Sequence, residues 1–179
     1  MPRRFLELAD AAPGELEELL RGGRPVAPES LADHVWHGYS LAMPAPLFKL
    51  FGRFGKTFAR DGGRVRGWNV RMRQNVEGWE PALFRGRPVT YGHYVVVPRP
   101  EGREREAYPN AFLVDYGKGG NRAWDPLARV RDWVVAVDDD LLVGRMFLSL
   151  GGRSVATPSY FALARGEPLT GLVAPPIAR

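Results

Sequence analysis

Two arginines stand inside apolar alternating segments, where a charged side chain needs a partner. Arg131 shares strand parity with Trp133, and Arg145 shares it with Phe147, so both guanidinium groups are expected to point toward a dry face. A buried guanidinium is costly unless it meets a carboxylate. That carboxylate belongs either to a bound ligand or to the protein itself, where the candidates are Asp115, Asp125, Asp132 and the run 138–140.

The three histidines do not form a metal-binding pattern. His34 and His37 are three residues apart, which suits a shared metal on a helix, whereas a strand turns them to opposite faces. Cysteine is absent, which excludes disulfides, thiolate metal sites and cysteine nucleophiles. We therefore expect neither a metal nor another cofactor.

Groups that could move protons are present, but no catalytic motif accompanies them. The Gly-x-Ser-x-Gly pattern of a serine nucleophile is missing. The glycine-rich segment 117–121 lacks the Gly-Lys-Ser/Thr order of a phosphate loop, so it is interpreted as a hairpin turn. Tyr91, His93, Asp115 and Tyr116 lie on neighbouring predicted strands and could serve as acids or bases. Asp115 and Tyr116 are adjacent in sequence, so at most one of them faces an interior.

Short alternating segments must position these residues, and a turn signal follows almost every one of them. In 64–75, apolar Trp68, Val70 and Met72 alternate with polar residues, as in a half-buried strand. Asp61-Gly62-Gly63 is a strong hairpin signal. About eight strands are predicted, at 36–43, 55–60, 64–75, 89–97, 111–116, 130–137, 141–150 and 154–165. We predict a mainly β fold, an antiparallel up-and-down barrel that encloses packed side chains or one small ligand.

The remaining segments predict short helices and a tail. Leu16, Leu19 and Leu20 share one helical face within 15–21, and glycines follow this segment. We expect an N-terminal helical segment over 1–35 with a second short helix at 28–34, a brief helix or apolar plug at 47–51, and an extended tail at 166–179, all in one domain over 1–179.

Composition narrows the classes of function. Hydrophobic residues at 45% and charged residues at 25% are typical of globular proteins. The net charge of +5 comes mostly from arginines interspersed with acids, without a nucleic-acid-binding motif, so we expect no nucleic-acid partner. No apolar stretch is long enough for a secretory signal or a membrane span. We expect a cytoplasmic protein without membrane insertion, whose oligomeric state the sequence leaves open.

A set of motifs resembles one poorly characterised family. His34-Val35-Trp36-His37-Gly38 is followed by Gly52-Arg53-Phe54-Gly55-Lys56, and further on come Asp115-Tyr116 and Asp125-Pro126-Leu127-Ala128-Arg129. Together they resemble the bacterial lipocalin-like proteins named for a Gly-x-Trp-x-Gly (GXWXG) motif, although His34 replaces the first glycine and Phe54 replaces a tryptophan. The resemblance spans roughly 14 to 165, and it implies a lipocalin-like barrel of uncharacterised function.

These patterns favour a binding protein for a small hydrophobic molecule, which could carry a carboxylate. The expected ligand-binding residues are Trp68, Met72, Tyr94, Phe112, Arg131, Trp133, Arg145, Phe147 and Tyr160. Two alternatives stay open. One is an enzyme, a cyclase or isomerase of a hydrophobic intermediate, that uses the same cavity. The other is a barrel with a solid core that acts as a protein-interaction module. Trp36 is expected to plug one end of the barrel beneath the N-terminal helices.

Overall fold

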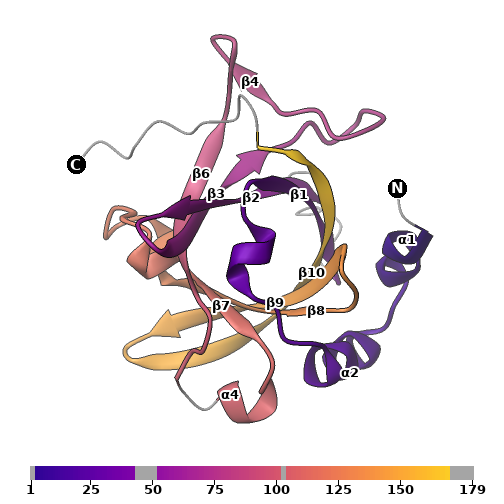
Figure 1. Ribbon diagram of the computed structural model, residues 1–179, viewed down its shortest axis with the longest axis vertical. Coiled ribbons are helices and arrows are strands. Elements are labelled where there is room, and N and C mark those ends of the chain that lie inside the picture. The colour runs from indigo at the N-terminus through magenta and orange to yellow at the C-terminus, as the bar shows by residue number, and fades with distance from the viewer. Residues whose placement is uncertain (1–2, 43–51, 102–103, 170–179) are drawn as a thin grey trace.

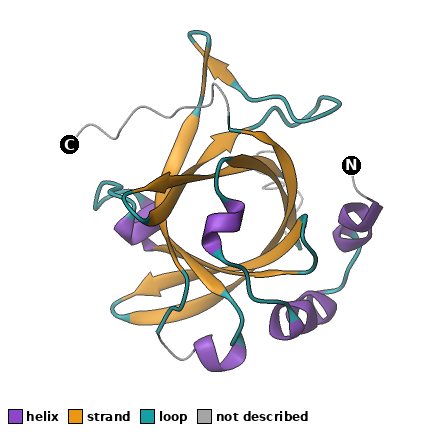
Figure 2. Ribbon diagram, in the orientation of Figure 1, coloured by secondary structure: helices purple, strands orange, loops and turns teal. Residues whose placement is uncertain are grey.

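Eight antiparallel strands close into a barrel in the computed structural model, which describes residues 3–42, 52–101 and 104–169. The order around the barrel is β1-β10-β9-β8-β7-β6-β3-β2, an up-and-down arrangement closed by pairing between β1 and β10 (Figures 1 and 2). The strands are β1 (His34–Leu41), β2 (Arg53–Asp61), β3 (Arg64–Arg71), β6 (Thr90–Val97), β7 (Phe112–Asp115), β8 (Val130–Ala136), β9 (Leu141–Leu150) and β10 (Arg153–Pro168). The predicted mainly β fold, an antiparallel up-and-down barrel, is confirmed.

Turn chemistry explains how the strands join. Asp61 pairs with Arg64 across Gly62 and Gly63, which have φ of 53° and 78°. Two consecutive positive φ values are what a tight type I′ hairpin needs, and glycine adopts them without strain. Two strands that the sequence did not predict, β4 (Leu83–Phe84) and β5 (Arg87–Pro88), form a small separate hairpin outside the barrel.

Within the part of the chain that the structure describes, the helices lie outside the wall of the barrel, apart from one short 3₁₀ helix. Figure 1 shows α1 (Arg3–Ala9) and α2 (Pro13–Gly22) together on one side of the ring. The helix expected at 15–21 is α2, and α1 lies within the helical segment expected over 1–35, whereas α4 (Glu104–Ala107) was not predicted. Further 3₁₀ turns are η2 (Tyr116–Lys118) and η3 (Pro126–Arg129). The plug expected at 47–51 lies outside the described residues.

The 3₁₀ helix η1 (Pro28–Leu31) sits across the middle of the ring in Figure 1. It replaces the longer helix expected at 28–34, because β1 already begins at His34. Leu31 is buried with the interior side chains, and its carbonyl oxygen accepts a hydrogen bond of 3.2 Å from the Trp36 indole. Trp36 is fully buried and packs edge-on against Phe58, 6.5 Å between ring centroids. Leu31 and Trp36 therefore fill this end of the barrel.

The barrel wall has a dry surface on both sides, each with its own cluster of buried side chains. Inward-facing residues form the interior cluster, which includes Trp36, Phe58, Phe112 and Val134. Outward-facing residues of β8, β9 and β10 form a second cluster with Leu16 and Leu20 of α2. The helices thus bury one outer face of the sheet, so apolar alternation alone cannot tell which face of a strand points inward.

Candidate functional site

A cavity of about 350 Å³ occupies the half of the barrel away from η1. The register of β1 and β10 fixes its position. Trp36 pairs with Arg165 at the end that Leu31 and Trp36 fill, whereas Ser40, which lines the cavity, pairs with Phe161 further along the strands. Residues from most of the strands and from η3 line it: Ser40, Phe54, Lys56, Asn69, Tyr91, Tyr116, Leu127, Val130, Asp132, Met146, Ser159 and Phe161. The interior is therefore packed at one end and hollow at the other.

Lys56 and Asp132 form a buried ion pair in the floor of this cavity. Both residues point inward because they share parity with interior neighbours, Lys56 with Phe58 and Asp132 with Val134. Their side chains are 1% and 5% exposed, and Lys56 Nζ lies 3.0 Å from Asp132 Oδ2. A buried charge without such a partner would be strongly destabilising.

Tyr116 and Asn69 complete the polar floor. Lys56 Nζ donates a hydrogen bond of 2.7 Å to the Tyr116 hydroxyl, and Asn69 Nδ2 donates one of 3.1 Å to the same oxygen. The Tyr116 hydroxyl lies 3.2 Å from Asp132 Oδ2, to which it can donate. All four side chains are buried. We call Lys56, Asn69, Tyr116 and Asp132 the polar floor.

Aromatic rings surround the ammonium group. Lys56 Nζ lies 4.6 Å from the Tyr94 ring centroid, 5.0 Å from that of Tyr116 and 5.5 Å from that of Phe161. Such distances fall within the range of cation–π attraction. The rings hold the lysine side chain in place and keep its charge in apolar surroundings.

Burial acts on both members of the pair in opposite directions. It lowers the pKa of Lys56, and the Asp132 carboxylate opposes that change. Burial also raises the pKa of Asp132, against the attraction of Lys56 and its hydrogen bonds from Lys56 and Tyr116. An ammonium–carboxylate pair and an amine–carboxylic acid pair both have zero net charge, so the pair is neutral in either arrangement.

Tyr91 reaches the cavity through an irregularity in β6. Asn69 pairs with Tyr91 while Gly67 pairs with Tyr94, so the register shifts between these positions. Gly92 has φ of 57° at this point, a conformation that glycine adopts readily. The bulge lets Tyr91 line the cavity although Tyr94, three positions away, also contacts the interior. Burial raises the pKa of Tyr91 to about 12, so its hydroxyl stays protonated at neutral pH.

Apolar side chains form the walls above the polar floor. Phe54 and Phe161 meet edge to face, 6.0 Å between ring centroids. Two glycines make room for these rings, because a Cβ on Gly38 would overlap Phe54 and one on Gly144 would overlap Phe161. The other apolar residues of the wall are Leu127, Val130 and Met146. A mostly apolar wall with a few convergent polar groups is typical of small-molecule sites.

The structure separates the nine residues that the sequence groups as ligand contacts. Tyr94 and Phe112 belong to the interior cluster. Trp133, Phe147 and Tyr160 belong to the outer cluster beneath α1 and α2. Trp68 and Met72 pack with Val35 and Val70 in a third cluster. Tyr94 is the member of this set that contacts the polar floor, through Lys56.

Arg131 and Arg145 both pair with carboxylates of the protein, and neither lines the cavity. Arg131 Nε lies 2.9 Å from Asp115 Oδ1, and Arg145 Nη1 lies 2.9 Å from Glu17 Oε2. Glu17 belongs to α2 and was not among the expected partners. The dry face to which Arg145 points is therefore the helix-covered exterior.

The other candidate acids and bases lie elsewhere. The Asp115 carboxylate accepts hydrogen bonds from the Gly117 and Lys118 amides as well as pairing with Arg131. His93 lies against Trp68, 6.3 Å between ring centroids, and His37 Nε2 lies 2.8 Å from Glu167 Oε2. Within residues 3–42, 52–101 and 104–169, no three His, Asp or Glu side chains form a group that could hold a metal ion.

Sequence reasoning missed Lys56, Asn69 and Asp132 as site residues. Asp132 was named as a partner for an arginine, although it shares parity with Val130 and Val134. A charged residue at such a position, in a strand that is apolar on both parities, is the signal that could have identified it. Lys56 carries the same signal, since it stands between Phe54 and Phe58 at inward positions.

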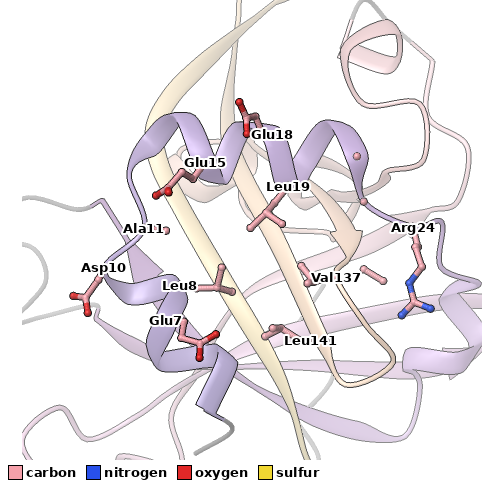
Figure 3. Close-up of a pocket in the computed structure, with 13 residues that line it drawn as sticks. Glu7, Leu8, Asp10, Ala11, Glu15, Glu18, Leu19, Arg24, Val137 and Leu141 are labelled. Atoms are coloured by element: carbon pink, nitrogen blue, oxygen red, sulfur yellow. The ribbon is translucent and has the colours of Figure 1, made fainter.

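A larger hollow of about 700 Å³ lies outside the barrel wall, between α1, α2 and the end of β8 (Figure 3). Leu8, Leu19, Val137 and Leu141 converge at its centre. Its charged residues are exposed, and they are Glu7, Asp10, Glu15, Glu18 and Arg24. The barrel cavity places buried charges against apolar walls, and this makes it the stronger candidate for a specific site.

Comparisons with known proteins leave the chain without an assigned family. No family model matches it, and no curated protein matches it in sequence. Among solved structures, it is similar to a protein titled Odorant Binding Protein OBP1, with a TM-score of 0.40 and 10% identity over 80% of this chain and 75% of that chain. This likeness assigns no ligand to the chain, and the GXWXG resemblance rests on the motif residues alone.

Proposed function

We propose that this protein binds one small, largely apolar molecule inside its barrel. The observation that carries the proposal is the cavity of about 350 Å³ whose apolar walls end at the polar floor. Its volume lies in the range of small-molecule sites. The body of the ligand would contact Phe54, Met146 and Phe161, and its polar end would face Lys56 and Asn69.

This proposal moves the ligand from the arginines to the polar floor. Arg131 and Arg145 have partners in Asp115 and Glu17, so Lys56 is the cation nearest to a ligand in the cavity. Tyr94 and Phe112 stay in the proposal as side chains beneath the floor. The GXWXG resemblance agrees with a barrel of this kind, and a cytoplasmic location and the absence of a nucleic-acid partner stay predictions. No helix within the described ranges could cross a membrane.

Filling the cavity tests the proposal. Ser159 lines the cavity on β10, and Val155 is 46% exposed on the same strand. A hydrophobic naphthalene fluorophore should bind the wild type with enhanced emission, and Ser159→Trp should abolish that binding. Val155→Trp, the matched control, should retain it. Equal binding by both variants would place the probe outside the cavity and contradict the proposal.

Proton transfer on the bound molecule is a second candidate function. The observation that favours it is the convergence of Lys56, Asp132, Tyr91 and Tyr116 in one cavity, because groups with perturbed pKa values cluster at catalytic sites. A bound methyl ketone would then exchange its α-protons for deuterium in heavy water faster with the wild type than with Asp132→Asn. Equal exchange rates would contradict proton transfer and leave binding as the proposed function.

A further inference from the structure

We infer that the cavity selects a molecule whose polar end is uncharged and accepts hydrogen bonds, and that it discriminates against a carboxylate. This inference rests on the proposed function and names its ligand class. It concerns the polar floor. Among the described residues that line the cavity, Lys56 is the only cation, and it already has a matching anion in Asp132.

Charge is the first step of the argument. The pair has zero net charge, so it offers no excess positive potential to an incoming anion. A carboxylate within hydrogen-bond reach of Lys56 would also face Asp132, whose oxygen lies 3.0 Å from the same nitrogen. Two carboxylates around one ammonium group in apolar surroundings repel each other, and the ligand would also lose its hydration. Arg71, which acts electrostatically on Tyr91, is exposed and does not line the cavity.

Hydrogen-bond capacity is the second step. An ammonium group has three donors, and Lys56 uses two of them on Tyr116 and Asp132. Asn69 has a second amide hydrogen, and the protonated Tyr91 hydroxyl adds another donor at the wall of the cavity. Among the described residues, no hydrogen bond occupies that hydroxyl. The open positions on Lys56, Asn69 and Tyr91 are donors, so an acceptor oxygen such as that of a ketone, ester or alcohol satisfies them.

Matched ligands of similar chain length test this selection. Methyl nonyl ketone, decanol and decanoate would each compete with the naphthalene fluorophore at neutral pH, where decanoate is ionised. The ketone and the alcohol should displace the fluorophore at concentrations at least about tenfold lower than decanoate. Decanoate binding as tightly as the ketone, or more tightly, would overturn the inference while leaving the binding function intact. No binding of the fluorophore at all would instead refute the proposed function.

A variant that removes the anion of the pair should raise the affinity for decanoate relative to the ketone, a change that loss of structure cannot produce. Asp132→Asn removes the carboxylate that competes with an incoming anion for Lys56, so the ratio of decanoate to ketone affinity should rise by at least about tenfold. Arg131→Ala, which removes a cation outside the cavity, should leave that ratio unchanged. An unchanged ratio in folded Asp132→Asn, or a ratio altered by Arg131→Ala, would contradict the inference.

A third variant covers the case in which Asp132→Asn does not fold. Tyr91 is partly exposed at the cavity wall and can be replaced by phenylalanine with little change in shape. Tyr91→Phe removes one donor, so ketone affinity should fall about threefold to tenfold. Ketone affinity equal to that of the wild type would refute the donor-based part of the selection, and the comparison of matched ligands decides the remainder.

Discussion

At the scale of single residues, the site depends on two charged side chains that a sheet interior would ordinarily exclude. Lys56 and Asp132 are buried together, and each is compensated by the other and by Tyr116. Such a pair costs desolvation energy and adds little net stability compared with apolar residues of the same size. Its presence at the bottom of a cavity therefore favours a role in ligand contact over a role in stability.

Replacing one member of this pair should be much more harmful than replacing both. Lys56→Met leaves Asp132 buried without its cation, and we expect the free energy of unfolding to fall by about 3–5 kcal/mol. The double variant Lys56→Met/Asp132→Leu removes both charges and should recover most of that loss. Urea denaturation followed by tryptophan fluorescence measures both. A double variant no more stable than the single one would show that the pair itself stabilises the fold.

At the scale of elements, the sequence predicted the strands well and their inward faces poorly. The eight barrel strands follow from alternation and turn signals such as Asp61-Gly62-Gly63. The side that faces inward does not follow, because α1 and α2 bury the outer face that carries Trp133 and Phe147. Tyr91 could not be placed either, since the bulge at Gly92 changes the parity of β6. The decisive information in both cases is tertiary.

The attachment of α2 to the barrel depends on Glu17. Its carboxylate lies 2.9 Å from the Tyr108 hydroxyl, 3.0 Å from that of Tyr160 and 2.9 Å from Arg145 Nη1. Glu17→Ala leaves these groups without their shared acceptor, and we expect a loss of about 1–3 kcal/mol of unfolding free energy. Glu18→Ala on the exposed side of the same helix is the matched control and should change stability little. Hydrogen exchange of the α2 amides would increase in the first variant alone; equal exchange in both would assign the attachment to Leu16 and Leu20.

At the scale of the whole molecule, the barrel has a packed end that stabilises the fold and a hollow end that could hold a ligand. Leu31 and Trp36 fill one end, and the packed layer between that end and the polar floor includes Phe58, Phe112 and Val134. The polar floor rests on this layer, so the side chains that would meet a ligand are held by a packed core. Ligand binding can then be altered at the apolar walls above the polar floor with limited effect on the fold.

Protonation of His37, His93 and Glu17 should lower the free energy of unfolding of the protein in acid. Burial lowers the pKa of His37, although the neighbouring Glu167 opposes the change, and burial together with Arg66 lowers the pKa of His93. Hydrogen bonds from Tyr108, Tyr160 and Arg21, together with the charge of Arg145, lower the pKa of Glu17 despite its burial. In each case the unfolded chain binds a proton more readily than the folded one, so acid favours unfolding.

The free energy of unfolding should therefore fall in two stages as the pH decreases. The histidines contribute as the pH falls through their ordinary pKa of 6.5, and Glu17 contributes below its ordinary value of 4.5. Urea denaturation at a series of pH values measures the curve. His37→Gln/His93→Gln should flatten the first stage and leave the second, whereas Glu17→Gln should flatten only the second. Variant curves that coincide with the wild-type curve through both stages would show that these groups titrate alike in the folded and unfolded chain.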